Sequence, residues 1–362
     1  MTSLTALEVG VSLALQICLI VGACQWLLRC AQDERIGERV WTCSQVLILI
    51  LTALAWTLPH LRLIDFRDLI QVTEASRITR YESTLASCIY YTWICGVSIQ
   101  LLRLASGIVQ SQRLIRAARR LEDCRANVFL SAEDRDNLSG ELEFRISRQV
   151  ETPFCWQISR PIIVLPKALS EAPLAEVQAI VRHELAHLRA GHPLHLFLQR
   201  LVETVHWYHP LVWWSSAKAA RSRELVCDDK AVRSADEAVD YLKGLLLLTQ
   251  SSAERIRLSA GAALQGTGSL LQERAARIAR RTWSLPTPAG TGACRKLLLV
   301  TALCGLIWLP VNVSASNRSV WSPWPRWSAS ILHELGITVR DYEIDSHRLL
   351  QHKHYSETSF TK

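Results

Sequence analysis

Four long apolar runs constrain the fold of this chain more than any other feature of its sequence. They cover residues 4–28, 40–58, 85–109 and 297–313 of 362. A helix of about 20 apolar residues is long enough to cross the hydrocarbon core of a bilayer. The sequence therefore predicts a mainly α-helical, multi-span membrane protein, with three transmembrane helices in residues 1–112 and a fourth in residues 296–313. A buried core helix is the alternative for any single run, and the fourth run, which contains Pro310, fits a span least well.

Two clusters of basic residues predict the orientation of these spans. One follows the third run and the other precedes the fourth. They are Arg113, Arg116, Arg119 and Arg120, and Arg274, Arg277, Arg280, Arg281, Arg295 and Lys296. Because positive residues are retained on the cytoplasmic side, we expect residues 113–295 to form a cytoplasmic domain and residues 314–362 a short extracytoplasmic tail. The loop between the second and third runs also carries several Arg residues and does not follow this rule.

The composition argues against two other kinds of protein. The formal net charge is +8, but the excess lies in short loops beside the apolar runs. This distribution fits a membrane protein better than a protein that binds nucleic acid directly. The chain has 11 Cys and no Cys-x-x-Cys pair. We therefore expect buried free thiols, with neither a disulfide framework nor a thiolate zinc site.

The predicted cytoplasmic domain contains a metal-binding motif. Residues 173–188 have an apolar period close to 3.6, which predicts one helix, and this helix carries His183, Glu184 and His187. Positions four apart lie on the same helix face, so both imidazoles can bind one Zn²⁺ ion, with Glu184 beside them as general base. The alternative is a solvated helix face that matches His-Glu-x-x-His by chance.

A catalytic zinc site of this kind needs a third protein ligand. The candidates are Glu224, His192, His195, His206 and His209. A scheme with a further Gly and His shortly after the motif is excluded, because Ala190 and Pro193 occupy those positions. We expect Glu224 to be the ligand, since the nearer histidines lie too close to the motif to turn back easily onto the metal. Asp228, one helical turn after Glu224, is predicted to hydrogen-bond to a ligating imidazole.

These residues predict hydrolysis of a peptide bond by a water molecule that the zinc activates. Glu184 would take a proton from this water and pass it to the leaving amine. A hydrogen-bond donor must also stabilise the oxyanion. His206, Tyr208 and His209 are the candidates for that donor, and packing at the membrane interface is the alternative role for this cluster.

Other patterns predict the rest of the domain. Residues 141–150 and 155–165 have strand patterns, with a turn at Thr152 and Pro153. We expect a two-stranded hairpin that either holds an extended peptide by strand addition or only covers the metal helix. Residues 193–214 are apolar but contain charged side chains, which favours a helix packed in the domain or at the membrane interface over a fifth span. The fold class is therefore an α+β zincin-like domain joined to membrane helices.

Several segments together resemble the BlaR/MecR-type integral membrane zinc metallopeptidases. They are Ile-Ser-Arg-Pro-Ile-Ile-Val-Leu-Pro at 158–166, Arg-His-Glu-Leu-Ala-His at 182–187, His-Trp-Tyr-His-Pro-Leu-Val-Trp-Trp at 206–214 and Arg-Glu-Leu-Val-Cys-Asp-Asp at 223–229. The resemblance covers residues 1–313, including the four spans. It implies a gluzincin-like peptidase of a bacterial inner membrane, with one Zn²⁺ per chain on His183, His187 and Glu224, and Glu184 as base.

The resemblance also suggests partners. Relatives that sense β-lactams carry an extracytoplasmic penicillin-binding domain after the fourth span, and their protease inactivates a DNA-binding repressor. We expect no such sensor domain here, because fewer than about 50 residues follow residue 313. The expected partners are a protein substrate, such as a DNA-binding repressor, and the lipid bilayer, with a homodimer as one option for the assembly. The alternatives are a quality-control protease for membrane proteins and a non-catalytic signal-transducing scaffold.

Overall fold

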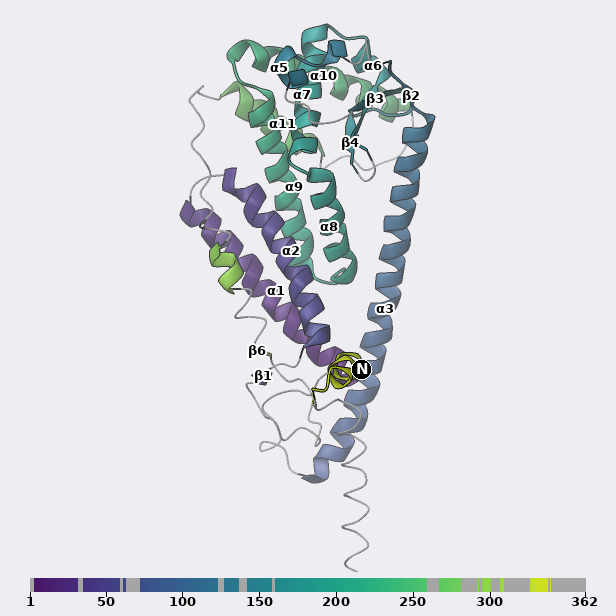
Figure 1. Cartoon of the computed structure of the whole chain (residues 1–362), viewed down its shortest axis with the longest axis vertical. Coiled ribbons are helices and arrows are strands. Elements are labelled where there is room, and N and C mark those ends of the chain that lie inside the picture. The colour runs from purple at the N-terminus through teal and green to yellow at the C-terminus, as the bar shows by residue number, and fades with distance from the viewer. Residues whose placement is uncertain are drawn as a thin grey trace, which may run out of the picture.

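The computed structural model describes residues 3–31, 35–58, 61–62, 72–122, 127–136, 142–157, 160–258, 267–280, 292, 295–300, 307–308, 326–337 and 339. Within these residues the protein is mainly helical, with one four-stranded sheet and one pair of two-residue strands. Long helices lie side by side over most of the length of the molecule, and the sheet gathers with shorter helices at one end, which we call the head (Figure 1). The predicted fold class is confirmed.

Three long helices contain the first three predicted spans. They are α1 (Ser3–Ala31), α2 (Arg35–Thr57) and α3 (Val72–Ala117). Each includes a segment long and apolar enough to cross a membrane, namely Val9–Cys30, Ile36–Thr57 and Thr84–Ala117. α3 has 46 residues, a rise of about 69 Å, whereas the hydrocarbon core of a bilayer is about 30 Å thick. α3 therefore extends past the membrane segment and reaches the head, where it leads into the sheet (Figure 1).

The predicted fourth span lies largely outside the described residues. Of residues 296–313 the structure describes 296–300, which are helical, and the strand β6 (Ile307–Trp308). β6 pairs in parallel with β1 (Leu61–Arg62), so the structure differs from a continuous helix at these two residues. Pro310 disfavours helix in the residue before it and removes a helical hydrogen bond. Of the predicted tail, the structure describes α13 (Arg326–Glu334), residues 335–337 and residue 339.

A hairpin of two helices lies between α2 and α3 (Figure 1). It consists of α8 (His192–Val205) and α9 (Pro210–Ala231), and Pro210 starts the second helix, so the single helix predicted in this region is divided. The tip of the hairpin contacts all three membrane helices. Nε2 of His206 lies 2.9 Å from Oγ1 of Thr52, and Nε2 of His209 lies 3.1 Å from the carbonyl oxygen of Ala14. The indole of Trp93 donates to the carbonyl of Val205 at 2.9 Å.

The sheet has the strand order β2-β3-β5-β4. The strands are β2 (Arg119–Arg120), β3 (Glu143–Ser147), β4 (Phe154–Trp156) and β5 (Ile162–Pro166). β3 pairs in parallel with β5, and β2 and β4 are antiparallel to their neighbours. The predicted hairpin with a turn at Thr152 and Pro153 is therefore wrong, because the second strand is split into β4 and β5. Pro161, which fixes φ and has no N–H, lies in the connection.

The metal-binding motif lies on α7 (Leu174–Arg189), which closely matches the predicted helix. The other elements of the head are η2 (Asn127–Phe129), α5 (Ala132–Asp136), α6 (Lys167–Ser170), α10 (Ala235–Leu258) and α11 (Thr267–Ala279). α7 buries Val177, Ile180, Val181 and Leu185, at helical spacing, in a core shared with the sheet and α10. Burying one such side chain contributes about 1.5–3 kcal/mol. This core therefore fixes the face of α7 that carries the histidines.

Gly244 of α10 allows a close contact with α7. An added Cβ at this position would lie 2.8 Å from Cγ1 of Ile180 and 3.3 Å from the carbonyl oxygen of Glu176. We expect Gly244→Val to lower the free energy of unfolding by about 1–3 kcal/mol through overpacking, measured as a lower Tm. Gly107→Val in α3 is the matched control, because nothing lies within 4 Å of a Cβ there. A wild-type Tm for Gly244→Val would contradict this packing.

Candidate metal centre

Three side chains from two helices converge in the head. α7 supplies His183 and His187, and α9 supplies Glu224. The Nε2 atoms of the two histidines are 3.1 Å apart, and each lies 3.5 Å from a carboxylate oxygen of Glu224. Ligand atoms bound tetrahedrally to one Zn²⁺ at 2.0–2.2 Å are separated by roughly 3.3–3.6 Å. The set therefore fits one zinc ion with a fourth position open for water or substrate.

Asp228 and Tyr241 contact the ring of His183 at Nδ1, the nitrogen that does not face His187 and Glu224. Oδ1 of Asp228 lies 3.1 Å from Nδ1 of His183, and the hydroxyl of Tyr241 lies 2.9 Å from the same nitrogen. The Tyr241 hydroxyl also donates to Asp228 at 2.7 Å. Asp228 is 1% exposed, so these contacts are shielded from water. The structure thus places Asp228 against Nδ1 of His183, whereas no sequence signal pointed to Tyr241, which lies 13 residues after Asp228.

Arg274 of α11 is a second residue at the centre that the sequence did not single out. Its guanidinium binds Asp228 through Nε at 2.9 Å and Nη2 at 2.7 Å. Its Nη1 lies 2.8 Å from Oε2 of Glu224. The position is one of many basic residues in this part of the sequence, and nothing in the local pattern distinguishes it from Arg277, which pairs with Asp229 instead. Only the fold selects Arg274.

Burial and neighbouring charges shift the pKa values at the centre. Burial, with the nearby charge of Glu224, raises the pKa of Glu184 to about 7. Burial opposes the charged form of His183, but hydrogen bonds to Asp228 and Glu224 outweigh it and raise the pKa of His183 to about 9. Burial and the charge of His183 lower the pKa of His187 to about 3. Without metal, His183 is therefore positively charged near pH 7 and lies next to a neutral His187.

The centre opens into a cavity of about 830 Å³. Its walls include residues 151–155, which lead into β4, and the apolar side chains of Leu245 and Leu248 on α10. Glu184, His183 and His187 line the same cavity. The motif residues therefore lie on the wall of a cavity that is bordered by β4 and α10.

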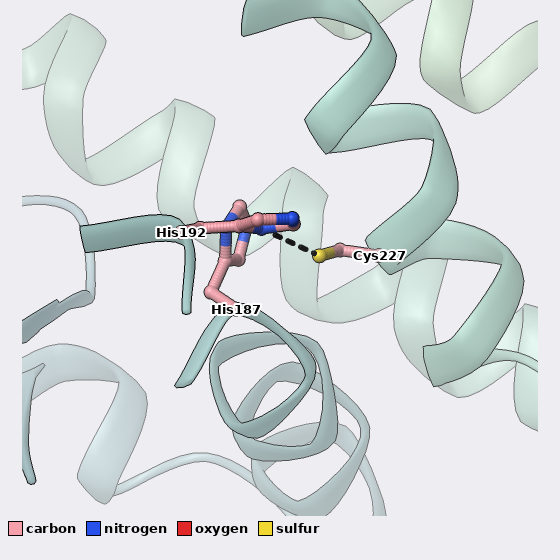
Figure 2. A group of neighbouring side chains, drawn as sticks. All are labelled: His187, His192 and Cys227. Carbon is pink, nitrogen blue, oxygen red and sulfur yellow. Dashed lines mark hydrogen bonds between the residues drawn. The ribbon is translucent and has the colours of Figure 1, made fainter. Parts of the chain in front are cut away.

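His192 turns back onto the metal-binding helix, although the sequence suggested that it lies too close in the chain to do so. Gly191 makes this turn, with φ of 68°, a left-handed conformation that favours glycine. Nδ1 of His192 lies 2.9 Å from Nδ1 of His187, on the side of that ring opposite Nε2. Figure 2 shows the two rings beside Cys227, whose Sγ is 3.5 Å from Nδ1 of His192. Burial raises the pKa of the Cys227 thiol, so it stays protonated.

The other histidines named from the sequence are elsewhere. His206 and His209 lie at the tip of the hairpin against the membrane helices, and α8 separates them from the metal set by 14 residues, about 21 Å. The structure does not bring them to the cavity, and Tyr208 lies beside them. His195 lies near His192 and Glu38 and is not grouped with His183, His187 and Glu224. The helix α8 accounts for this separation, which the spacing of the histidines in the sequence does not reveal.

Comparison with known proteins matches residues 4–278 to the family described as BlaR1 peptidase M56. This chain belongs to the BlaR1 peptidase M56 family. It is 25% identical over 174 residues to the "Regulatory protein BlaR1" of Bacillus licheniformis, in an alignment that covers 47% of this chain and 28% of that protein. The resemblance found in the sequence is confirmed. Membership of the M56 family implies a zinc-dependent metallopeptidase, and the cluster of His183, His187 and Glu224 could hold the metal.

Loss of Glu224 should weaken metal binding more than loss of any supporting residue. Removing an outer partner of a metal ligand costs about 10–100-fold in affinity. We expect Glu224→Ala to exceed that loss and to be purified with little zinc, measured by elemental analysis and chelator competition. Glu171→Gln, an exposed carboxylate paired with Lys167, is the control. Full zinc retention in Glu224→Ala would assign the third ligand to a histidine.

Zinc binding to this M56 centre should release a proton near pH 7. His183, with its pKa raised to about 9, is protonated there without metal and must lose that proton when Nε2 binds zinc. Zinc affinity should therefore increase by up to tenfold per pH unit, roughly, from pH 7 to pH 9 and level off above. Calorimetry in buffers of different ionisation enthalpy measures the proton count. Binding without proton release would contradict the assigned state of His183.

Proposed function

We propose that this chain is an integral membrane zinc endopeptidase that hydrolyses peptide bonds. The observation that carries the proposal is the donor set of His183, His187 and Glu224, with the carboxylate of Glu184 buried beside it. Two His, one Glu and an open position are the donor chemistry of a catalytic zinc, whereas structural zinc sites are closed by four protein ligands. The three membrane-spanning candidates support the membrane location.

In this proposal His183 and His187 hold the zinc through Nε2, and Glu224 holds it through its carboxylate. When bound, the metal supplies a Lewis acid and lowers the pKa of a water molecule to about 7. Asp228 accepts a hydrogen bond from Nδ1 of His183, which fixes the tautomer that leaves Nε2 free for the metal. Tyr241 and Arg274 in turn hold Asp228 in place.

Glu184 is the residue that transfers the proton from water to the leaving amine in this proposal. With a pKa of about 7, it accepts a proton from the attacking water near neutral pH and returns it to the leaving amine. Arg274 lines the cavity next to Glu224 and is our candidate for the cation that stabilises the oxyanion. It replaces His206 and His209 as the candidate for that role, because these two lie at the hairpin tip.

An extended segment of a protein is the substrate that the cavity fits best. β4 is the last strand in the order β2-β3-β5-β4, so one of its edges is not paired within the described sheet. Residues 151–155 line the cavity along this strand. A peptide that pairs with β4 would run past the histidines, with main-chain hydrogen bonds providing affinity and the apolar wall of α10 taking side chains.

We further propose that this protease acts in transmembrane signalling. The relative from Bacillus licheniformis is named a regulatory protein, which supports a regulatory substrate such as a transcriptional repressor. The basic residues that flank the head support a cytoplasmic orientation in a bacterial inner membrane. A quality-control protease is the second candidate, because the cavity walls are largely apolar and would select weakly among sequences. The intact donor set argues against a non-catalytic scaffold.

A comparison of new protein N-termini tests this function. Cells expressing wild type or Glu184→Gln are compared, since Gln keeps the shape of the side chain but cannot accept the proton. Glu184→Gln should retain zinc and lose cleavage. One or two Glu184-dependent termini indicate a signalling protease and identify its substrate, whereas many indicate quality control. Equal cleavage by purified Glu184→Gln and wild type, with equal zinc content, would refute Glu184 as the base.

A further inference from the structure

His192 connects a residue of a membrane helix to a candidate zinc ligand. Its Nδ1 lies 2.9 Å from Nδ1 of His187, and its Nε2 lies 2.8 Å from Oε1 of Glu38. His192 is 3% exposed, so both contacts are shielded from solvent. Glu38 belongs to the first turn of α2 and lies within its candidate membrane span, Ile36–Thr57. A chain of three side chains therefore runs from α2 to the metal centre.

The role of His187 as a zinc ligand determines which nitrogen atoms carry hydrogen in this series of side chains. When Nε2 of His187 binds the metal, its Nδ1 must carry the hydrogen and donate to Nδ1 of His192. His192 then carries its own hydrogen on Nε2, which donates to the carboxylate of Glu38. Both short contacts are satisfied by this one arrangement. It has the polarity of the carboxylate–histidine–metal supports found around zinc, lengthened by one imidazole.

Two glycines allow this series of hydrogen bonds between Glu38, His192 and His187 to form. Gly191 reverses the backbone between α7 and α8, which returns His192 to His187. Gly37, next to Glu38, lets α2 approach α9, because an added Cβ would lie 2.9 Å from Oγ of Ser222. The start of α2 therefore packs closely against α9, the helix that carries Glu224. Gln45, two turns further along α2, adds a separate contact by donating to Oγ of Ser215 at 3.1 Å.

We propose that Glu38 and His192 are positioning residues for the zinc ligand His187, so that membrane helix α2 forms part of the support of the metal centre. The proposal rests on the proposed function, since it requires zinc on His183, His187 and Glu224. Through the two hydrogen bonds, the carboxylate of Glu38 fixes the orientation of the His187 ring and makes its Nε2 a stronger donor to the metal. Displacing the start of α2 would release this ring.

A second metal ion is the competing interpretation. His187, His192 and Cys227 (Figure 2) lie close enough together to bind one, as do Glu38, His192 and His195. The contacts of 2.8 and 2.9 Å along the chain are those of hydrogen bonds. They are shorter than the 3.1–3.5 Å separations within the proposed zinc set. Geometry therefore favours hydrogen bonds, and metal stoichiometry decides between the two.

The test uses the full chain in lipid nanodiscs, with Glu38→Ala, Glu38→Gln and the control Gln45→Met. The control removes another buried contact of α2, one that makes no hydrogen bond to a proposed zinc ligand. We measure zinc per chain, the zinc Kd by chelator competition, the visible spectrum of the Co²⁺-substituted protein, and thermal unfolding with and without zinc. Glu38→Ala should weaken zinc binding about 10–100-fold and alter the Co²⁺ spectrum. Glu38→Gln, which keeps an acceptor oxygen, should lose less.

Each outcome bears on the proposal. One zinc per chain, weaker binding in Glu38→Ala than in Glu38→Gln, and wild-type binding in Gln45→Met support it, provided that the metal-free Tm of Glu38→Gln is unchanged. A wild-type Kd and Co²⁺ spectrum in Glu38→Ala overturn it, as does an equal loss in Gln45→Met. Two zinc ions per chain, one of them lost in Glu38→Ala, overturn it in favour of a second metal site. A wild-type chain that binds no zinc overturns the proposed function itself.

Discussion

Two carboxylates one helical turn apart on α9 set the charge balance on which the metal centre depends. Glu224 and Asp228 stay ionised although burial opposes it, and hydrogen bonds to His183 lower the pKa of Glu224 to about 2 and hold that of Asp228 well below its usual range. An ion removed from water without compensation costs several kcal/mol. Arg274 from α11, the proton on His183 and, when bound, the metal provide the compensation. α7, α9 and α11 must therefore meet at one point, and the apolar core beneath α7 holds them there.

The sequence could predict those parts of the centre that lie on a single helix. His183 and His187, and likewise Glu224 and Asp228, are four residues apart, and helical geometry alone places each pair on one face. Their meeting across two helices was an inference from the number of ligands that zinc needs. Three of the four apolar runs predicted as spans match the candidate membrane helices among the described residues, because length and composition are local properties.

Contacts between distant elements could not be predicted. Arg274 is one of two Arg residues in α11, and only the packing of α11 against α9 selects it. The sheet was misjudged because β3 pairs in parallel with β5 across a connection, and a parallel partner is not encoded in the alternation of one strand. His206 and His209 were misplaced because their distance from the metal depends on α8 continuing as a helix away from it.

The hairpin of α8 and α9 makes the membrane helices part of the centre. α9 carries Glu224 toward one end, while its other end and the hairpin tip contact α1, α2 and α3 through Ala14, Thr52 and Trp93. Protein interiors are close-packed, so a shift at one end of a buried helix is transmitted along it. A productive metal site tolerates displacements of about 0.5 Å. The separation between Glu224 on α9 and the two histidines on α7 therefore depends on the position of α9, which the membrane helices contact at the other end. The hairpin of α8 and α9 thus joins the peptidase head to the membrane helices by direct contacts.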